Sequence, residues 1–573
     1  MQRFSRKYIV VLALAIVLAM LLLVGCRGDD AADGAGANVI RPDLPAGTMQ
    51  VEGPDYIFER FYPPITITQG KFLSTAYQFR PGESMEENEW LDWIYQDLGI
   101  RIDTIWSVLG SNIHGDAAEQ MINVRIASGD LPDIFRVNSA QLSQLAEADL
   151  IEDLTDMWEE LAMYSTRDVM NSDGGYALRS AHIGGRLMGL PVITSNFDQA
   201  IMLWVRQDWL DNLGLDLPRT MDDVFEIARA FTEDNPAGTG YNNTFGLGLN
   251  MNIFEGSHNV LRGFFEGFGG YVNAWIDDGQ GGLMYGGIQP EIKTALGEVA
   301  RMFAAGQIDP EFGVQDNARV NELIVQGRIG MTYGLHHIAY NPLHPSNDLD
   351  GANWVPVPIV SATGTPATPV VGLATTSYIV QRRGLEQNDV LMRLANHFCV
   401  RAFGGGYNEQ FMVYDCEETH MQFHIFQLPP FFTDDSRKNV DMFRRYDYMF
   451  RTGNTEGFPQ GDIDGFNWLM YYRGEQGTGS FGFYKWVGPG GAMSIVNHYV
   501  ENSLILSNAF TGALTPAMAN YGSFLNTMKL EAFTRIIMGI DDLDAFDEFA
   551  EHWWNLGGEQ MTAEVNEWFD SNR

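Results

Sequence analysis

The chain has 573 residues, 45% of them hydrophobic, which is enough for more than one hydrophobic core, so two lobes are expected. It holds 36 Lys and Arg against 74 Asp and Glu, a formal net charge of -38. Binding to a phosphate backbone requires clustered basic side chains, so this composition argues against a nucleic-acid partner. The acidic balance by itself indicates only solubility and repulsion between like charges.

The first 25 residues have the pattern of a secretory signal segment. Three basic residues precede an uncharged apolar run over residues 8–24. The run ends in Leu-Val-Gly-Cys, which resembles the lipobox of bacterial lipoproteins and implies cleavage before Cys26 and acylation of its thiol. The alternative is an uncleaved membrane anchor, because the run is at the lower limit of a membrane span. Either alternative places the folded part outside the cytoplasm.

Residues 26–50 predict a flexible tether. They are rich in Gly, Ala, Asp and Pro and have no apolar period of either 2 or 3.6 residues. A segment of this kind cannot bury a core, so we expect the globular body to begin near Val51.

The first elements of the body alternate between strand and helix. A strand is expected around Thr66–Thr68, a helix over Glu86–Leu98, a strand from Ile100 and a helix over Ala117–Ile126. The first helix has an acidic first turn, a Gly after its last residue and one apolar face made by Trp90, Ile94 and Leu98. This β-α-β-α order predicts a parallel sheet covered by helices.

Several later segments carry a family resemblance. The segment Ala-Ser-Gly-Asp-Leu-Pro-Asp-Ile at residues 127–134 resembles family 1 extracellular solute-binding proteins of ABC importers. Further similar segments follow in the family's order: residues 150–156, 189–191, 204–215, 306–312, 327–331 and 515–518, with Pro218, Thr220 and Asp223 at a helix start. The closing segment, residues 531–568, is most similar to the large lipoproteins linked to oligosaccharide uptake.

The resemblance implies an α/β fold of two lobes, the type II periplasmic-binding-protein fold of maltose-binding proteins. Each lobe would hold a mainly parallel sheet with flanking helices, and crossing strands would form a hinge. We expect lobe 1 to comprise residues 51–198 and about 370–490, and lobe 2 residues 199–369 and about 491–573.

In such a fold the ligand lies outside the carboxyl ends of the strands. By resemblance to maltose-binding proteins, the loop after the strand at Ile134 carries sugar contacts, although the aromatic side chain expected there is missing. Polar contacts are expected from Asn138, Ser139, Asp198, Asn250, Asn252, Tyr333 and His336, and stacking from Trp275, Trp468 and Trp486. Trp204 is expected in the core because it lies in the middle of a strand.

Other motifs in the chain are weak. There is no Gly-x-Ser-x-Gly, His-Glu-x-x-His or Gly-x-x-x-x-Gly-Lys, and the Gly-x-Gly-x-x-Gly from Gly477 follows no hydrophobic strand. The spacing of Cys416, His420 and His424 would fit a zinc site, but we favour ordinary packing. The acids from Asp462 would fit part of a calcium loop, but we favour an ordinary turn. Cys399 and Cys416 form either a disulfide or two free thiols. No metal or cofactor is therefore expected.

The sequence predicts a binding protein, not an enzyme. We expect a lipid-anchored monomer at the outer face of the cell membrane, whose lobes close on an oligosaccharide and present it to an ABC permease. A peptide or another organic solute is the alternative ligand. A secreted glycoside hydrolase and a surface adhesin are the alternatives from other functional classes. A hydrolase needs two carboxyl groups that flank the scissile bond, and the sequence cannot identify such a pair among 74 acidic residues.

Overall fold

The computed structural model describes residues 60–571 except 74–78, 81, 110–115, 239–242, 376, 405–413, 417–420, 424, 459, 476–480 and 513. The signal segment, Cys26 and the tether lie outside the described residues. Within the described part of the chain, no helix combines the length and the apolar character needed to cross a membrane.

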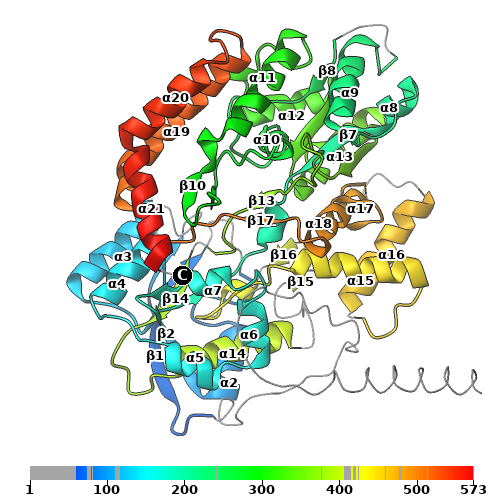
Figure 1. Cartoon of the computed structure of the whole chain (residues 1–573). Coiled ribbons are helices and arrows are strands. Elements are labelled where there is room, and N and C mark those ends of the chain that lie inside the picture. The colour runs from blue at the N-terminus through cyan, green and yellow to red at the C-terminus, as the bar shows by residue number, and fades with distance from the viewer. Residues whose placement is uncertain are drawn as a thin grey trace, which may run out of the picture. The chain divides into compact units, whose positions relative to one another are not determined.

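The first sheet has five strands in the order β2-β1-β3-β14-β6. Their bounds are β1 (Ile65–Leu73), β2 (Ile100–Leu109), β3 (Ile134–Val137), β6 (Leu190–Pro191) and β14 (Tyr378–Gln381). Strand β1 is parallel to β2 and β3, whereas β14 is antiparallel to β3 and β6. The β-α-β-α start predicted from the sequence is confirmed (Figure 1).

Helices from the N-terminal part and one later helix accompany this sheet. They are α2 (Glu89–Leu98), α3 (Asp116–Ser128), α4 (Ser139–Glu147), α5 (Thr155–Leu161), α6 (Tyr164–Met170), α7 (Tyr176–Ser180) and α14 (Val390–Phe403). Helix α2 begins after Asn88, whose side chain accepts from the N–H of Leu91, and ends at Gly99, which has φ +68°. Its predicted apolar face is buried, which confirms the helix predicted from the period of apolar residues.

The second sheet has four strands in the order β12-β7-β11-β8. Their bounds are β7 (Met202–Arg206), β8 (Phe245–Leu247), β11 (Ile329–Gly334) and β12 (Trp354–Val357). Strand β11 is parallel to β8, but β7 is antiparallel to both of its neighbours, so this sheet is more mixed than expected. Trp204 lies in the middle of β7 and is fully buried, as predicted.

The second sheet and its core are associated with a large set of helices. They are α8 (Gln207–Leu213), α9 (Met221–Glu233), α10 (Arg262–Gly267), α11 (Pro290–Ala304), α12 (Asn317–Val325), α13 (Leu343–Asp350), α19 (Pro516–Ile537), α20 (Ala545–Trp553) and α21 (Glu559–Ser571). Thr220 and Asp223 form a capping box at the start of α9, as the sequence predicted for Thr220. Figure 1 shows α19 beside α20, with α21 continuing from the end of α20.

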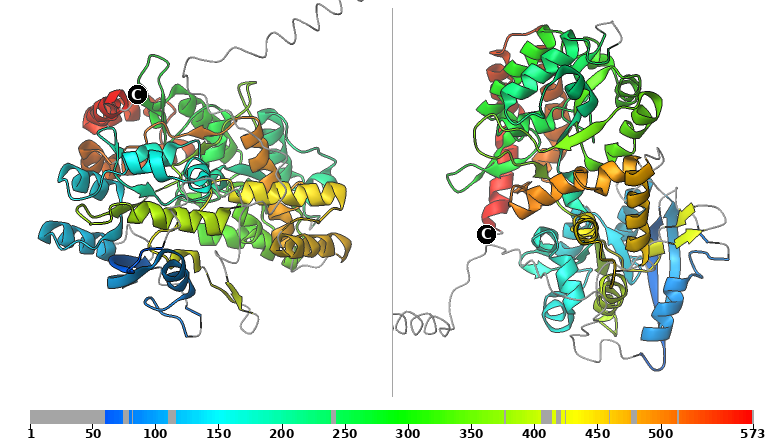
Figure 2. Two further views of the ribbon diagram at one scale, coloured as in Figure 1. Left: turned by 90° about the horizontal axis from the view of Figure 1, so that it is seen from below. Right: turned by 90° about the vertical axis from the view of Figure 1, so that its right-hand side faces the viewer.

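Four further helices extend this second core. They are α15 (Lys438–Thr452), α16 (Gln460–Glu475), α17 (Phe481–Val487) and α18 (Ala492–Glu501), the yellow and orange helices of Figure 2. Their buried side chains share one cluster with Trp204 of β7 and Trp354 of β12. Residues 438–487 therefore pack with the second sheet, whereas the sequence analysis assigned residues up to about 490 to lobe 1. The break falls earlier because the apolar faces of these helices match the outer side of β7 and β12.

Three segments, here called the connectors, join the two cores: residues 193–200, 372–375 and 433–437. Hydrogen bonds tie them together: the N–H of Thr194 donates to the carbonyl of Ala374 (2.6 Å), and the N–H of Asp434 donates to that of Ile193 (3.1 Å). The Ser436 hydroxyl donates to the carbonyl of Thr194 (3.1 Å). The chain thus crosses between the sheets along adjacent paths, as expected of a hinge.

Short elements complete the described fold. The remaining strands pair as β4 (His182–Ile183) with β5 (Arg186–Leu187), β9 (Trp275–Asp277) with β10 (Leu283–Tyr285), β13 (Val370–Val371) with β17 (Leu506–Ser507) and β15 (Tyr414–Cys416) with β16 (Met421–Phe423). The short helical turns are η2 (Asn196–Gln199), η3 (Gly286–Ile288), η4 (Phe312–Val314), η5 (His336–Ala339), η7 (Ile425–Gln427) and η9 (Trp554–Gly558).

Candidate ligand-binding site

Three residues singled out in the sequence lie together beside the connectors. Asp198 is in η2, His336 begins η5 directly after β11, and Trp486 is in α17. The amide Nδ2 of Asn439, in the first turn of α15, donates to Oδ2 of Asp198 at 2.6 Å. Nε2 of His336 lies 3.7 Å from the same oxygen. We call these four residues the Asp198 cluster.

An aromatic row leads away from this cluster. The His336 ring stacks on Trp486, with centroids 5.7 Å apart and an interplanar angle of 24°. Phe483 lies 6.0 Å from Trp486 and stacks on Trp468 at 5.3 Å. Trp468, at the outer end of the row, is 49% exposed. The row therefore runs from a largely buried polar cluster to an exposed indole.

The polar atoms of the cluster are incompletely hydrogen-bonded. Oδ1 of Asp198, Nδ1 of His336 and Nε1 of Trp486 are buried and have no hydrogen-bond partner among the described residues. Leaving a buried polar atom unpaired costs about 1–3 kcal/mol, so native proteins have few of them. Three such atoms lie together here, which makes the cluster a candidate ligand-binding site.

The protonation of the cluster is set mainly by burial. Burial raises the pKa of Asp198 to about 7; the hydrogen bond from Asn439 opposes this shift and the nearby charge of Asp434 adds to it. Burial, with a smaller contribution from His337, lowers the pKa of His336 to about 3. At neutral pH the imidazole is therefore uncharged, and Asp198 and His336 do not form an ion pair. The cluster presents polar groups of low charge, which suits an uncharged polyhydroxylated ligand segment.

The polar residues predicted in the first lobe take structural roles. Asn138 is the N-cap of α4, where its side chain and that of Gln141 form a capping box, and it is 6% exposed. Ser139 is the first residue of the same helix and is half-buried. The cap occupies Oδ1 of the Asn138 side chain, and the expected ligand contacts of Asn138 and Ser139 both stay predictions.

The two Asn residues after β8 differ from each other. Asn250 is 2% exposed, and its Nδ2 donates to the carbonyl of His258 (3.2 Å) and to Asn317 (3.3 Å). It belongs to a buried amide network and does not present its side chain to solvent. Asn252 is exposed in the following turn, so its expected ligand contact stays a prediction.

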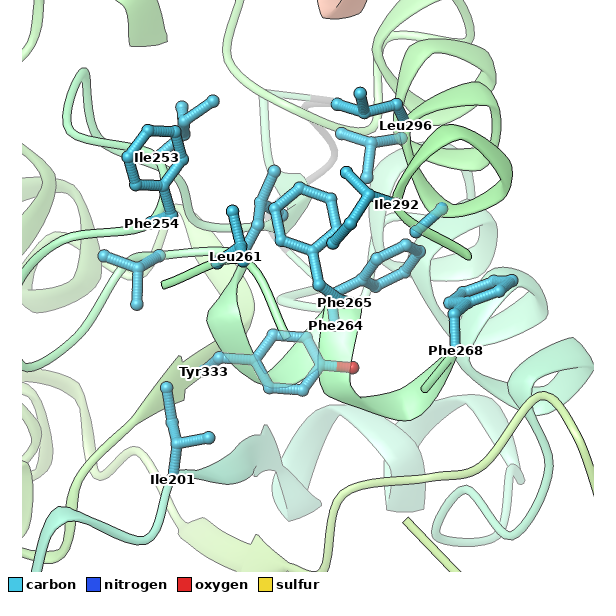
Figure 3. Close-up of a cluster of buried hydrophobic side chains, with 14 of the residues drawn as sticks. Ile201, Ile253, Phe254, Leu261, Phe264, Phe265, Phe268, Ile292, Leu296 and Tyr333 are labelled. Carbon is cyan, nitrogen blue, oxygen red and sulfur yellow. The ribbon is translucent and has the colours of Figure 1, made fainter. Parts of the chain in front are cut away.

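Trp275 and Tyr333 are core residues. Trp275 pairs through β9 with β10, packs on Tyr285 and is 5% exposed. Tyr333 is fully buried, and Figure 3 shows its ring among the apolar side chains around α10. The sequence placed both at the site because the one lies in a Gly-rich stretch and the other ends a strand. Tertiary packing covers both side chains in this structure, and their expected ligand contacts stay predictions.

The metal motifs do not form sites in the described residues, where no group of three His, Cys, Asp or Glu side chains could hold an ion. Asp462 and Asp464 lie in helix α16, and Asp462 accepts from Nε of Arg445 at 2.6 Å, so the segment is a helix where a turn was expected. Cys399 is a free, buried thiol. His420, His424, Gly477 and Gly479 lie outside the described residues.

Sequence reasoning missed Asn439. This residue lies 241 positions from its partner Asp198 and has no motif around it. Its only signal is a polar side chain in the first turn of an amphipathic helix, which many helices share.

The comparisons agree with the fold and the order of its segments. A family model described as bacterial extracellular solute-binding protein matches residues 110–381. The polygalacturonan/rhamnogalacturonan-binding protein YtcQ of Bacillus subtilis is 25% identical over 325 residues, covering 56% of this chain and 56% of that protein. The chain thus matches about half the length of that relative.

Two further proteins are similar over more of the chain. Lipoprotein LipO of Bacillus subtilis is 23% identical over 469 residues, covering 79% of this chain and 84% of that protein. The solved structure of the ABC-transporter substrate-binding protein FusA of S. pneumoniae, in complex with kestose, matches with a TM-score of 0.52 and 14% identity, covering 88% and 99% of the two chains. The chain is therefore similar to the bacterial extracellular solute-binding proteins over residues 110–381, and it has the two-lobe fold of the FusA structure.

Proposed function

We propose that this protein captures an oligosaccharide outside the cytoplasm and delivers it to an ABC permease. The observation that carries the proposal is the Asp198 cluster. Its unpaired buried carboxylate oxygen, imidazole nitrogen and indole N–H lie beside a stacked aromatic row. Sugar rings need both features, since their hydroxyls donate and accept hydrogen bonds while their C–H faces stack on aromatic planes.

The names of the relatives support a sugar ligand. YtcQ is named for binding polygalacturonan and rhamnogalacturonan, and the FusA structure holds kestose. Both are binding proteins, which supports a role in capture and not in hydrolysis. The ligand stabilises the closed arrangement only to the extent that it binds that arrangement more tightly than the open one.

The Leu-Val-Gly-Cys segment supports attachment to the outer face of the membrane through a lipid on Cys26, and the name of LipO is in line with it. Residues 27–50 would then hold the body near its permease. Replacing Cys26 with Ala is expected to abolish incorporation of labelled palmitate and to release the protein into the medium. Continued incorporation would contradict the assignment of the lipid to Cys26.

Thermal unfolding across a panel of oligosaccharides tests the binding function. A ligand that binds only the folded state, present at 100 times its Kd, stabilises that state by about 2.7 kcal/mol and so raises the midpoint of thermal unfolding. At least one oligosaccharide should raise the midpoint, and the Asp198→Ala variant should lose the shift. If no glycan shifts the midpoint and a peptide or another solute does, the sugar proposal is wrong.

An assay for reducing ends separates binding from hydrolysis. A binding protein retains the oligosaccharide and releases no new reducing ends on prolonged incubation, whereas a hydrolase releases them at a constant rate. Steady release that disappears with loss of Asp198 would replace the binding proposal with a glycoside hydrolase.

A further inference from the structure

A buried lysine and a half-buried arginine lie on one aromatic ring at the first sheet. Lys71 is near the end of β1 and is 4% exposed; its Nζ donates to the carbonyl of Pro429. Arg136 is in β3, where its Nε donates to the hydroxyl of Ser377 at 2.7 Å. Nζ of Lys71 lies 5.3 Å and Cζ of Arg136 5.4 Å from the centroid of the Phe432 ring. We call Lys71, Arg136 and Phe432 the cation pair and its ring.

Neither cation has an acidic partner among the described residues, and Nη1 and Nη2 of Arg136 have no hydrogen-bond acceptor there. Arg206 shows how the same protein treats a buried guanidinium: its side chain is 3% exposed, and it pairs with Asp208 at 2.6 Å and lies 3.5 Å from Asp350. Buried charges are normally paired because removal from water is costly. Burial, and then the charge of Arg136, lower the pKa of Lys71 well below its usual value, as expected for a buried lysine without an acidic partner.

The position of the pair relates it to ligand binding. Strands β1 and β3 are parallel, so their carboxyl ends meet at the same edge of the first sheet. Ser377 follows the second connector and Phe432 precedes the third, so the pair lies where the connectors leave this sheet. In open α/β sheets this edge is where ligands bind.

We propose that Lys71 and Arg136 bind a carboxylate of the ligand, so that the captured oligosaccharide contains uronic acid residues. The proposal rests on the proposed function and adds the charge of the sugar to it. The half-buried Arg136 offers two free Nη groups in the planar fork that matches a carboxylate, and Lys71 lies over the same Phe432 ring. In a chain of net charge -38, an anionic ligand needs such a local cationic site to overcome the overall repulsion.

Calorimetric titration of the full chain with oligogalacturonates, and with the same oligosaccharides fully methyl-esterified, tests the proposal. The acidic form should bind at least about tenfold more tightly, because hydrogen bonds to a charged group contribute more than neutral ones. Arg136→Gln should abolish this preference and leave affinity for the ester within about threefold, and Lys71→Met should reduce it. Arg136→Lys keeps the charge but loses the fork, so it should retain part of the preference.

Arg382→Gln is the matched control. Arg382 lies just beyond β14 on the same sheet but pairs with Asp133 at 2.7 Å, so its loss should leave the preference unchanged. Circular dichroism of each variant shows whether it is folded, and a folded Arg136→Gln that keeps the preference overturns the inference. Tighter binding of neutral than of acidic oligosaccharides also overturns it but leaves the proposed function standing. Binding of no oligosaccharide at all contradicts the proposed function itself.

Discussion

The cation pair and the Asp198 cluster both contain charged side chains without opposite-charge partners, but they are built differently. Lys71 and Arg136 come from two adjacent strands of one sheet, so their spacing is set by the strand register. The Asp198 cluster combines η2, η5, α15 and α17, which belong to a connector and to the second core. A ligand group held by the first depends little on the setting of the connectors, whereas the second keeps its geometry only when these segments are aligned. We therefore expect the cation pair to bind a carboxylate in any setting of the connectors, and the Asp198 cluster to bind hydroxyl groups only when its segments are aligned.

The largest expected effect on affinity comes from removing the carboxylate of the Asp198 cluster. Asp198→Ala leaves the Asn439 amide without its acceptor and removes a group that bonds the ligand. Affinity for every oligosaccharide that binds, acidic or neutral, should fall by about 10- to 100-fold, the equivalent of one or two good hydrogen bonds. Calorimetric titration measures the change.

Asp92→Ala serves as the control for this variant. Asp92 is exposed on α2, and its loss removes the same charge far from any site described above. The control should bind like the original chain. A folded Asp198→Ala protein with unchanged affinity would show that the Asp198 cluster has a structural role and does not bind the ligand.

The pH dependence of stability should also separate the two regions. The pKa of Asp198 is about 7 in the folded state and near 3.8 when unfolded, so between these values the folded protein holds a proton that the unfolded chain has lost. The free energy of unfolding therefore falls as pH rises from about 4 to about 7. Asp198→Asn should remove this loss and gain roughly 4 kcal/mol relative to the original chain across the window. Urea unfolding at several pH values measures it, and parallel curves for the two proteins would contradict it.

Lys71 should give the opposite slope. Its pKa is lowered in the folded state, so as pH rises toward 10.5 the unfolded chain still holds a proton that the folded protein has released. The free energy of unfolding should therefore rise with pH in the alkaline range, and Lys71→Met should remove this rise. The difference in urea midpoint between the original chain and the variant isolates Lys71 from other buried lysines. A difference that does not change with pH would mean that Lys71 has an ordinary pKa.

Local patterns predicted much of the fold because they depend on neighbours in sequence. The apolar face of α2, the cap at Thr220 and the burial of Trp204 follow from helical period, capping chemistry and position within a strand. The helices that hold Trp468 and Trp486 were not predicted, because the Gly residues in these stretches mask the helical period. These helices form because the second core covers one side of each.

The site was only partly predictable. Asp198, His336 and Trp486 were each selected by position, but nothing local indicates that they meet one another or Asn439. Tyr333 and Trp275 were also selected by position, but both are core residues. The sequence did contain a signal for Lys71, because it follows the inward-facing Ile67 and Gln69 along β1, where a lysine is out of place. Its ring partner Phe432, more than 350 positions away, could not be inferred.

The smallest effect is expected at the outer end of the aromatic row. Trp468 is 49% exposed and contacts Phe483 on one face, so Trp468→Ala should change the free energy of unfolding by no more than about 1 kcal/mol. Stacking at this distance from Asp198 contributes only when the ligand is long enough to reach it. Affinity for short oligosaccharides should be unchanged, and affinity for longer members of the same series should fall by a few fold. Because Trp468 carries no charge, acidic and methyl-esterified ligands should lose the same factor, which separates this stacking surface from the cation pair. An equal loss for ligands of every length would instead show that Trp468 acts by holding Phe483 and Trp486 in place for the Asp198 cluster.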